Sequence, residues 1–421
     1  MMSFRGFEGP AGTGKTHRLI EEVGRHLVTA PLASHQRVLA LTFMHGSRKR
    51  LDGRFGEIPT LRNKAVCMTI DSFAQSIFQR WVTFAAAKGI SAEGFNQVCD
   101  ACGKLLEYHD VVSWVSRSFP VVVVDEAQEL KPERLRILKA LAPYVSLFVA
   151  ADEFQCLDDT VDTAPFLEWF VTGQVESLTI VHRTTQQGLL NAGVALRALQ
   201  SPCPDTGLAI AYHFPNVMPF AIASTLHSCS QGSKALIYAP SGHRWADDII
   251  TRVTCGMQSR GYGRIPPLRL FHEEQSKEEQ KKILALFAGA SAHSADAICA
   301  ALDDIASPPP WLASVRLAIV SRSQTQGLYV WALTDLTKLV ERKAALYRAF
   351  GFHSIRGIPV MSIHQAKNRQ FDHVVLLWPP GVPGSDEWKA RLLYNGITRS
   401  ARSCHVFVRS RQSCNRPPFL F

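Results

Sequence analysis

The stretch "VVVVDEAQEL", residues 121–130, places four consecutive valines directly before two acidic residues. Branched apolar residues without polar alternation predict a strand that is covered on both faces, as in the parallel sheet of an α/β protein. Ligands of such sheets bind beyond the carboxyl ends of the strands, so Asp125 and Glu126 are expected at a crevice. Adjacent carboxylates at that place indicate a divalent metal and a proton acceptor, although an ordinary surface turn is the alternative.

The segments around this stretch alternate between strand and helix patterns. "RVLALTF" (37–43) and "VSLFVAAD" (145–152) predict strands, and "PERLRILKALAPY" (132–144) predicts a helix. A second alternating series begins near Glu176, and its strands are expected in "KALIYAPS", "VRLAIVSRS", "DHVVLLWPP" and "CHVFVRS". This order predicts an α/β fold with parallel sheets in two domains, residues 1–175 and 176–421, with a less regular, partly helical insertion at about 205–315.

The charge of the chain is positive and unevenly distributed. The 421 residues carry 46 Lys and Arg against 36 Asp and Glu, a net charge of +10. One basic cluster is "HGSRKRLDGRF" (45–55), and no acidic residue follows Glu387, whereas seven basic residues do: Lys389, Arg391, Arg399, Arg402, Arg409, Arg411 and Arg416. Such clusters suit a polyanion such as nucleic acid, and a solvated surface is the alternative for each cluster alone.

Apolar runs and cysteines limit the class of protein further. No apolar run approaches the roughly 20 residues that cross a bilayer, so we expect no membrane partner. The first ten residues lack the apolar run of a signal peptide, which predicts a cytoplasmic location. Of ten cysteines, only Cys99 and Cys102 form a C-x-x-C pair, without a second pair at zinc-site spacing. We expect reduced, buried cysteines rather than a metal site.

A phosphate-binding loop is predicted at the amino end. "GPAGTGKT" (9–16) fits the pattern G-x-x-x-x-G-K-[ST] in full. Backbone amides of such a loop converge on phosphate oxygens, the lysine reaches the terminal phosphates, and the final hydroxyl can ligate Mg²⁺. Together with the later acidic pair, this predicts a nucleoside triphosphatase in which Asp125 holds Mg²⁺ and Glu126 polarises the attacking water. The predicted nucleotide-binding residues of the loop are Gly9, Gly12, Thr13, Gly14, Lys15 and Thr16.

Seven stretches resemble, in order, the motifs of superfamily 1 helicases of the UvrD/Rep-like group. They are "LTFMHGSRKRL", "TIDSF", "DEAQEL", "AADEFQ", "VHRTT", "MSIHQAKNRQFDHVV" and "LLYNGITRSARS", and they extend across nearly the whole chain. The resemblance implies two RecA-like domains that bind ATP and Mg²⁺ between them. It also implies single-stranded nucleic acid as a partner, and we favour DNA.

The same resemblance implies roles for individual residues. Gln155 would contact the γ-phosphate, and Arg183 and Arg399 would be arginine fingers contributed by the second domain, a role that suits a planar charged group. Hydroxyl and aromatic side chains would line the nucleic-acid track. The predicted track residues are Thr42, Phe43, Thr69, Ser72, Phe73, Ser362 and His364, with Arg48 added from the basic "SRKR" loop. For Phe43 and Phe73, a place in the core is the alternative.

Several positions differ from the family pattern. The adenine-recognising glutamine is missing from the eight residues before Gly9, and His182 replaces the tyrosine that stacks on adenine. Asn368 and Gln370 replace the glycine and glutamate of the fifth motif; Asn tolerates a left-handed backbone, and Gln370 retains a hydrogen-bonding side chain for the nucleotide. The aromatic residue that usually follows the third motif is also absent, so Phe166 or Trp169 is expected to contribute to strand contact instead.

These features predict an ATP-dependent DNA helicase or translocase, with 3′ to 5′ travel implied by the family. Because the accessory insertions look small and a stacking aromatic is missing, the alternative is a nucleotide switch that binds nucleic acid or a partner without unwinding. A phosphotransferase is a third possibility, but it does not explain Gln155 and the two late arginines.

Overall fold

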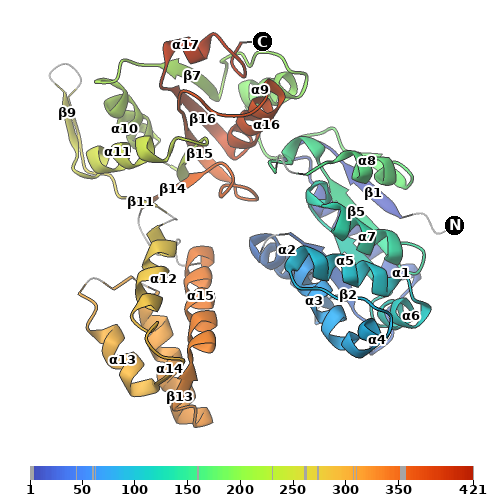
Figure 1. Ribbon diagram of the computed structural model, residues 1–421. Helices are drawn as coiled ribbons and strands as arrows, with labels where there is room; N and C mark the ends of the chain where they lie inside the picture. Colours follow the sequence, from blue (N-terminus) through green and yellow to red (C-terminus); the bar gives the residue numbers. More distant parts are fainter. Residues whose placement is uncertain are drawn as a thin grey trace.

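The computed structural model contains two six-stranded sheets, and the strands within each sheet are parallel throughout (Figure 1). This confirms the predicted α/β fold class. The structure describes residues 4–43, 45–58, 61, 63–158, 161–229, 231–259, 263–272, 275–306, 308–309, 311–350 and 357–420.

The first sheet has the strand order β3-β2-β4-β5-β1-β6. Its strands are β1 (Arg5–Glu8), β2 (Val38–Thr42), β3 (Ala65–Thr69), β4 (Val121–Val124), β5 (Ser146–Ala151) and β6 (Gln174–Ser177). The helices of this part are α1 (Lys15–Thr29), α2 (His45–Glu57), α3 (Ile70–Arg80), α4 (Val82–Ala87), α5 (Phe95–Leu106), α6 (His109–Ser118), α7 (Pro132–Leu141) and α8 (Ala164–Phe170). The three strands predicted from the sequence here, and the helix α7, are confirmed. The basic "SRKR" segment lies in α2, so its prediction as a loop is wrong.

The valine run of β4 is buried on both faces of the sheet. Val122 and Val124 pack into one core with side chains of α3, α5 and α7. Val121 and Val123 point the other way, into a second core formed with α1 and α2. A strand between two helical layers has no solvent face, which is why the sequence shows no polar alternation.

The second sheet has the strand order β11-β14-β8-β15-β16-β7. Its strands are β7 (Leu208–Tyr212), β8 (Lys234–Tyr238), β11 (Leu270–His272), β14 (Ile358–Ser362), β15 (Phe371–Trp378) and β16 (Ser400–Val408), and a short hairpin of β9 (Met257–Ser259) and β10 (Gly263–Ile265) lies beside it. Its helices are α9 (Gln187–Arg197), α10 (Met218–Ser228), α11 (His243–Thr254), α16 (Asp386–Ile397) and α17 (Arg411–Cys414).

A helical segment between β11 and β14 stands apart from the second sheet (Figure 1). It has its own core, in which Trp311, Val315 and Trp331 are buried. The segment consists of α12 (Gln275–Ala285), β12 (Ala292–Ser294), α13 (Ala295–Asp303), α14 (Leu312–Gln326), β13 (Val330–Ala332) and α15 (Leu333–Phe350).

Two sequence predictions about this region are corrected. The predicted insertion at 205–315 begins too early, because β7 and β8 are strands of the second sheet and the separate helical segment starts only after β11. "VRLAIVSRS" is part of α14 and not a strand. Its buried residues Leu312, Val315 and Ile319 recur at helical spacing, whereas the apolar run taken alone reads equally as a strand. The predicted domain boundary near 175 falls inside β6, which pairs with β1, so we propose a division after β6.

Candidate active site

Three chain segments meet at one edge of the first sheet because the strands that precede them are neighbours. Strands β4, β5 and β1 lie side by side, and each runs in the same direction. The phosphate loop follows β1, the Asp125–Glu126 pair follows β4, and Asp152 follows β5. This is the place where ligands of parallel sheets bind.

The phosphate loop depends on its glycines. Gly9, Gly12 and Gly14 all have positive φ, at 154°, 85° and 83°. A Cβ atom on Gly12 would lie 2.6 Å from the Cβ of Arg183, so a side chain there would push the second-domain segment away. Lys15 Nζ donates to the carbonyl oxygens of Gly9, at 2.7 Å, and Pro10, at 3.0 Å. The loop is therefore folded around its lysine, at the amino end of α1.

The acidic pair lies beside the loop, in the arrangement expected of a metal site. Thr16 Oγ1 donates to Asp125 Oδ2 at 2.9 Å, and Asp125 is only 7% exposed. Burial, with the neighbouring Glu126 carboxylate, raises the pKa of Asp125 to about 6. A hydroxyl and a carboxylate are hard oxygen ligands of the kind Mg²⁺ prefers. Thr16 and Asp125 therefore fit the predicted metal.

Glu126 has a left-handed backbone, with φ of 62°. This conformation is costly for a residue with a side chain, and it occurs often at functional sites. Gln128 Nε2 donates to Glu126 Oε2 at 2.6 Å, and Gln128 Oε1 accepts from the backbone amide of Asp152 at 2.9 Å. Gln128 thus fixes the carboxylate of Glu126 relative to the loop that follows β5.

The pKa of Asp125 leads to a pH prediction for metal binding. The carboxyl group is protonated below its pKa, and a protonated carboxyl does not ligate Mg²⁺. Affinity for Mg²⁺ is therefore expected to fall as the pH drops through about 6, by about tenfold for each further pH unit. Calorimetric Mg²⁺ titrations at several pH values would measure this, with Asp125→Asn binding weakly at every pH. A decline that begins only near the ordinary value of 3.8 would contradict the role of burial.

Gln155 connects the first domain to the second. Its Nε2 donates to Asp152 Oδ2 at 2.6 Å, and its Oε1 accepts from Arg399 Nη2 at 3.3 Å. Arg399 is 2% exposed, and its Nε donates to the carbonyl oxygen of Asn395 at 2.9 Å. A buried guanidinium from the second domain thus reaches the edge of the first sheet.

Arg183 lies next to the phosphate loop. Its Nη1 donates to the carbonyl oxygen of Thr398 at 2.6 Å, one residue before Arg399. The backbone amide of the preceding residue, His182, donates to the carbonyl oxygen of Gly12 at 2.8 Å. The His182 side chain is exposed beside the loop. The structure thus places Arg183 and His182 beside the phosphate loop, whereas Arg399 contacts Gln155.

The seam is the boundary at which the second domain contacts the phosphate-loop edge of the first sheet. Other contacts at this seam were not predicted from the sequence. Tyr394 on α16 accepts a hydrogen bond at its hydroxyl oxygen from the Ala11 amide of the phosphate loop, at 2.7 Å. Lys367 forms an ion pair with Glu129, also across the seam. Burial lowers the pKa of Lys367 to about 8, although the Glu126 carboxylate acts in the opposite direction. Tyr394 and Lys367 both lie within motifs quoted above, so the signal for them was present but not used.

The fifth motif confirms one expectation. Asn368 has φ of 63°, the left-handed backbone that its substitution for glycine predicted. Gln370 is exposed on the loop before β15, and its contact with nucleotide stays a prediction.

Among the predicted nucleic-acid contacts that the structure describes, three residues are buried: Thr42, Thr69 and Phe73. Phe73 is 1% exposed and packs in the core of the first domain, so its prediction as a stacking residue is wrong and the core alternative applies. Thr42 is also buried, and Phe43 is half-buried against the same core. Phe166, suggested as a substitute contact, is buried as well, because α8 packs it against Phe170.

The remaining predicted contacts lie at helix and turn starts. Thr69 caps α3 by accepting from the amide of Ser72, which is exposed. Ser362 exchanges hydrogen bonds with Gln365 through their side chains and backbone amides, and His364 is exposed. The side chain of Arg48 lies outside the described part of the chain. The nucleic-acid roles of these residues stay predictions.

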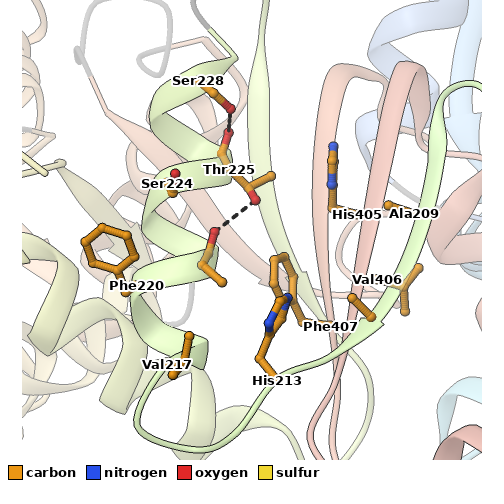
Figure 2. Close-up of a pocket in the computed structure, with 12 residues that line it drawn as sticks. Ala209, His213, Val217, Phe220, Ser224, Thr225, Ser228, His405, Val406 and Phe407 are labelled. Atoms are coloured by element: carbon orange, nitrogen blue, oxygen red, sulfur yellow. Dashed lines mark hydrogen bonds between the residues drawn. The ribbon is translucent and has the colours of Figure 1, made fainter. Parts of the chain in front are cut away.

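A cavity of about 450 Å³ lies elsewhere in the second domain, between α10 and the strands β16 and β7 (Figure 2). Figure 2 shows Thr225 on the side of the helix that faces the strands, with Phe407 and His405 on the strand side. Burial lowers the pKa of His405, which favours its neutral form. The residues that line the cavity are mainly apolar, and none of them is a lysine or an arginine. The cavity therefore does not suit a triphosphate.

The C-x-x-C pair lies inside α5, away from the seam. Cys99 and Cys102 are both buried, and burial raises the pKa of each thiol. Among the residues that the structure describes, no three His, Cys, Asp or Glu side chains group as metal ligands. In the same described ranges, no helix combines the length and apolar character needed to cross a bilayer.

One parallel sheet carries the phosphate loop and the other part of the chain contributes a buried arginine beside it, which gives an α/β phosphate-loop architecture with two RecA-like sheets. Residues 357–407 match the family model of the UvrD-like helicase C-terminal domain. This part of the chain, from β14 into β16, is similar to the UvrD-like helicase C-terminal domain, and the predicted resemblance is confirmed there.

Solved structures and curated proteins give a weaker picture. The chain is similar to the crystal structure of arterivirus nonstructural protein 10, a helicase, with a TM-score of 0.40, 10% identity and coverage of 99% of this chain and 62% of the other. The complex of that helicase with DNA gives a TM-score of 0.39, 10% identity and coverage of 97% and 61%. The chain thus spans about three fifths of their length. A comparison with curated proteins finds no match.

Proposed function

We propose that this protein hydrolyses ATP in the seam between its two sheets and uses the energy to move along single-stranded DNA. The observation that supports this most is the position of Arg399. A buried guanidinium from the second domain is hydrogen-bonded to Gln155 of the first, next to the phosphate loop. A guanidinium stabilises the negative charge that develops on a phosphoryl group during transfer. The guanidinium of Arg399 can approach that phosphoryl group only when the two domains are together.

Each part of the site has a role in this proposal. The phosphate loop binds the triphosphate through its backbone amides and Lys15. Glu126, held by Gln128, orients and deprotonates the attacking water, and Gln155 reports the γ-phosphate to Arg399. Mg²⁺, held by Thr16 and Asp125, would neutralise phosphate charge when bound.

Contacts with the strand are proposed at the exposed hydroxyl and imidazole groups. Ser72 at the start of α3 and His364 after β14 are exposed, and hydroxyls commonly donate to phosphates. The preference for DNA and 3′ to 5′ travel rest on resemblance to the UvrD/Rep-like group.

A second candidate is an ATP-driven switch that binds nucleic acid but does not unwind it. Phe73 and Phe166 are both buried, which removes two of the aromatic rings expected to stack on bases. Base stacking contributes about 1–3 kcal/mol for each base, so fewer rings mean a weaker grip on the strand.

One set of measurements separates the two candidates. ATP hydrolysis is measured with and without single-stranded DNA, and unwinding is measured on a duplex with a single-stranded tail. Hydrolysis that DNA stimulates together with unwinding supports the helicase, and hydrolysis that DNA stimulates without unwinding supports a translocase or the switch. Hydrolysis that neither single-stranded DNA nor, in a parallel assay, single-stranded RNA stimulates contradicts both candidates.

The variant Glu126→Gln should bind ATP normally but hydrolyse it about a hundred- to a thousandfold more slowly, because the base for the attacking water is lost. The matched control is Glu168→Gln, an exposed glutamate on α8. Hydrolysis by Glu126→Gln at the rate of this control would exclude Glu126 as the base.

A further inference from the structure

Arg197 makes a contact across the seam that no motif predicts. It is the last residue of α9 in the second domain, and its Nη1 donates to Asp152 Oδ1 in the first domain at 2.6 Å. The Asp152 side chain is 0% exposed, so Arg197 supplies the closest cationic contact to a fully buried carboxylate. A buried charge without a close partner is strongly unfavourable.

Two aromatic rings fix the position of this guanidinium. Its central carbon lies 5.3 Å from the ring centre of Phe154 and 5.6 Å from that of Tyr394. These rings come from opposite domains and meet edge to face, with 5.1 Å between their centres. Burial acts to lower the pKa of Arg197, but the Asp152 carboxylate outweighs it and the pKa is raised. Arg197 is therefore held as a charged group between two domains.

Asp152 connects Arg197 to the phosphate loop. Its second oxygen, Oδ2, accepts from Gln155 Nε2 at 2.6 Å and lies 3.7 Å from Lys15 Nζ. Lys15 is thus within reach of two anions, the Asp152 carboxylate and any phosphate bound in the loop. The stronger the charge that Asp152 presents, the more it competes for Lys15.

We propose that Arg197 is a positioning residue that neutralises Asp152 and so leaves Lys15 free to bind the terminal phosphates. This rests on the proposed function for the site but goes beyond it, since Arg197 contacts neither the phosphate loop nor the acidic pair. If Arg197 has this role, nucleotide affinity depends on a residue of the second domain. The affinity then depends on contact between the two domains.

The proposal distinguishes two effects of losing Arg197. If the residue only fastens the domains together, its loss lowers stability, and the removal of Asp152 adds no benefit. If it acts through charge, the unpaired carboxylate draws Lys15 toward itself and nucleotide binding weakens. Changing Asp152 to a neutral residue then reverses part of the loss.

The experiment is a double-mutant cycle on the full chain, read out as affinity for a fluorescent, non-hydrolysable ATP analogue with Mg²⁺. Arg197→Met is expected to weaken binding about tenfold, the size of one lost hydrogen bond to a charged group. The double variant Arg197→Met with Asp152→Asn is expected to recover most of that loss. Arg197→Lys keeps the charge but not the planar group, and should lie between them.

The matched control is Arg316→Met, which removes an exposed arginine paired with Asp303 in the helical segment. It should bind the analogue as the wild type does. Wild-type affinity in Arg197→Met, or a double variant as weak as the single one, would overturn the proposal. Thermal unfolding identifies variants that do not fold. If Arg197→Met does not fold, Arg197→Lys replaces it in the double-mutant cycle.

The outcomes also separate this proposal from the function on which it rests. A wild type that binds the analogue but ignores single-stranded DNA contradicts the motor function and leaves the role of Arg197 intact. A DNA-stimulated wild type whose Arg197→Met variant binds normally contradicts only the role of Arg197. A wild type that does not bind the analogue overturns both.

Discussion

Replacing Arg399 with alanine is expected to slow ATP hydrolysis by about a thousandfold or more, the loss seen when an arginine finger is removed. The side chain is buried and donates to Gln155, so its guanidinium is held at the edge of the first sheet. Binding of the ATP analogue should change little, because the phosphate loop itself is intact. Single-turnover hydrolysis together with equilibrium binding measures the two effects separately.

Two further variants make the Arg399 test specific. Arg399→Lys keeps the charge but loses the planar fork, and it should be nearly as slow as alanine. Arg402→Ala removes an exposed arginine three positions later on β16 and should hydrolyse ATP at the normal rate. If Arg399→Ala keeps more than about a tenth of the wild-type rate, the finger role is wrong.

Replacing Lys15 with alanine is expected to reduce hydrolysis by about a hundred- to a thousandfold and also to weaken ATP binding. Lys15 is the charged group of the phosphate loop, and its Nζ already lies against two loop carbonyls, at the centre of the cradle. Loss of Lys15 should therefore lower both the rate of hydrolysis and the affinity for ATP, whereas loss of Arg399 should affect the rate more than the affinity.

Stability has to be measured in parallel, since Lys15 also holds the loop together. Thermal unfolding of Lys15→Ala should stay within a few degrees of the wild type, because the loss is limited to two hydrogen bonds to backbone carbonyls and a 3.7 Å contact with Asp152, which keeps Arg197 as its closer partner. Lys139→Ala, an exposed lysine on α7, is the matched control. A Lys15→Ala protein that is stable and still hydrolyses ATP at the control rate would show that the loop does not bind the triphosphate.

The fold of the first domain could be predicted because its sequence pattern has one structural solution. A run of four valines fits a central strand between two helical layers, and the valines do alternate between two cores. The helical segment of the second domain could not be predicted in the same way. Within α14, Val315 and Ile319 belong to an apolar run short enough to fit a strand or a buried helix, and packing against Trp311 and Trp331 decides between them.

In the candidate site, too, some residues could be predicted from the sequence and others could not. Lys15 and Asp125 could be predicted from the phosphate-loop pattern and from a buried strand that ends in two acids, whereas Arg399 could be predicted only from the resemblance to helicase motifs. Arg197 could not be found, since a lone arginine at a helix end is usually solvated and its partner Asp152 is 45 residues away in the sequence. Phe73 failed for the opposite reason: a motif position does not tell whether a ring faces the core or the solvent.

The way in which the helical segment joins the second sheet limits how the protein can be shortened. Strands β11 and β14 are neighbours and parallel, so the chain leaving β11 must return to the opposite end of the sheet before β14 begins. A tight turn cannot make that return, which takes a crossover of about a dozen residues or more. The segment is therefore a connection of the sheet that has grown into a body of its own, and any trimmed form must still carry the chain back across the sheet.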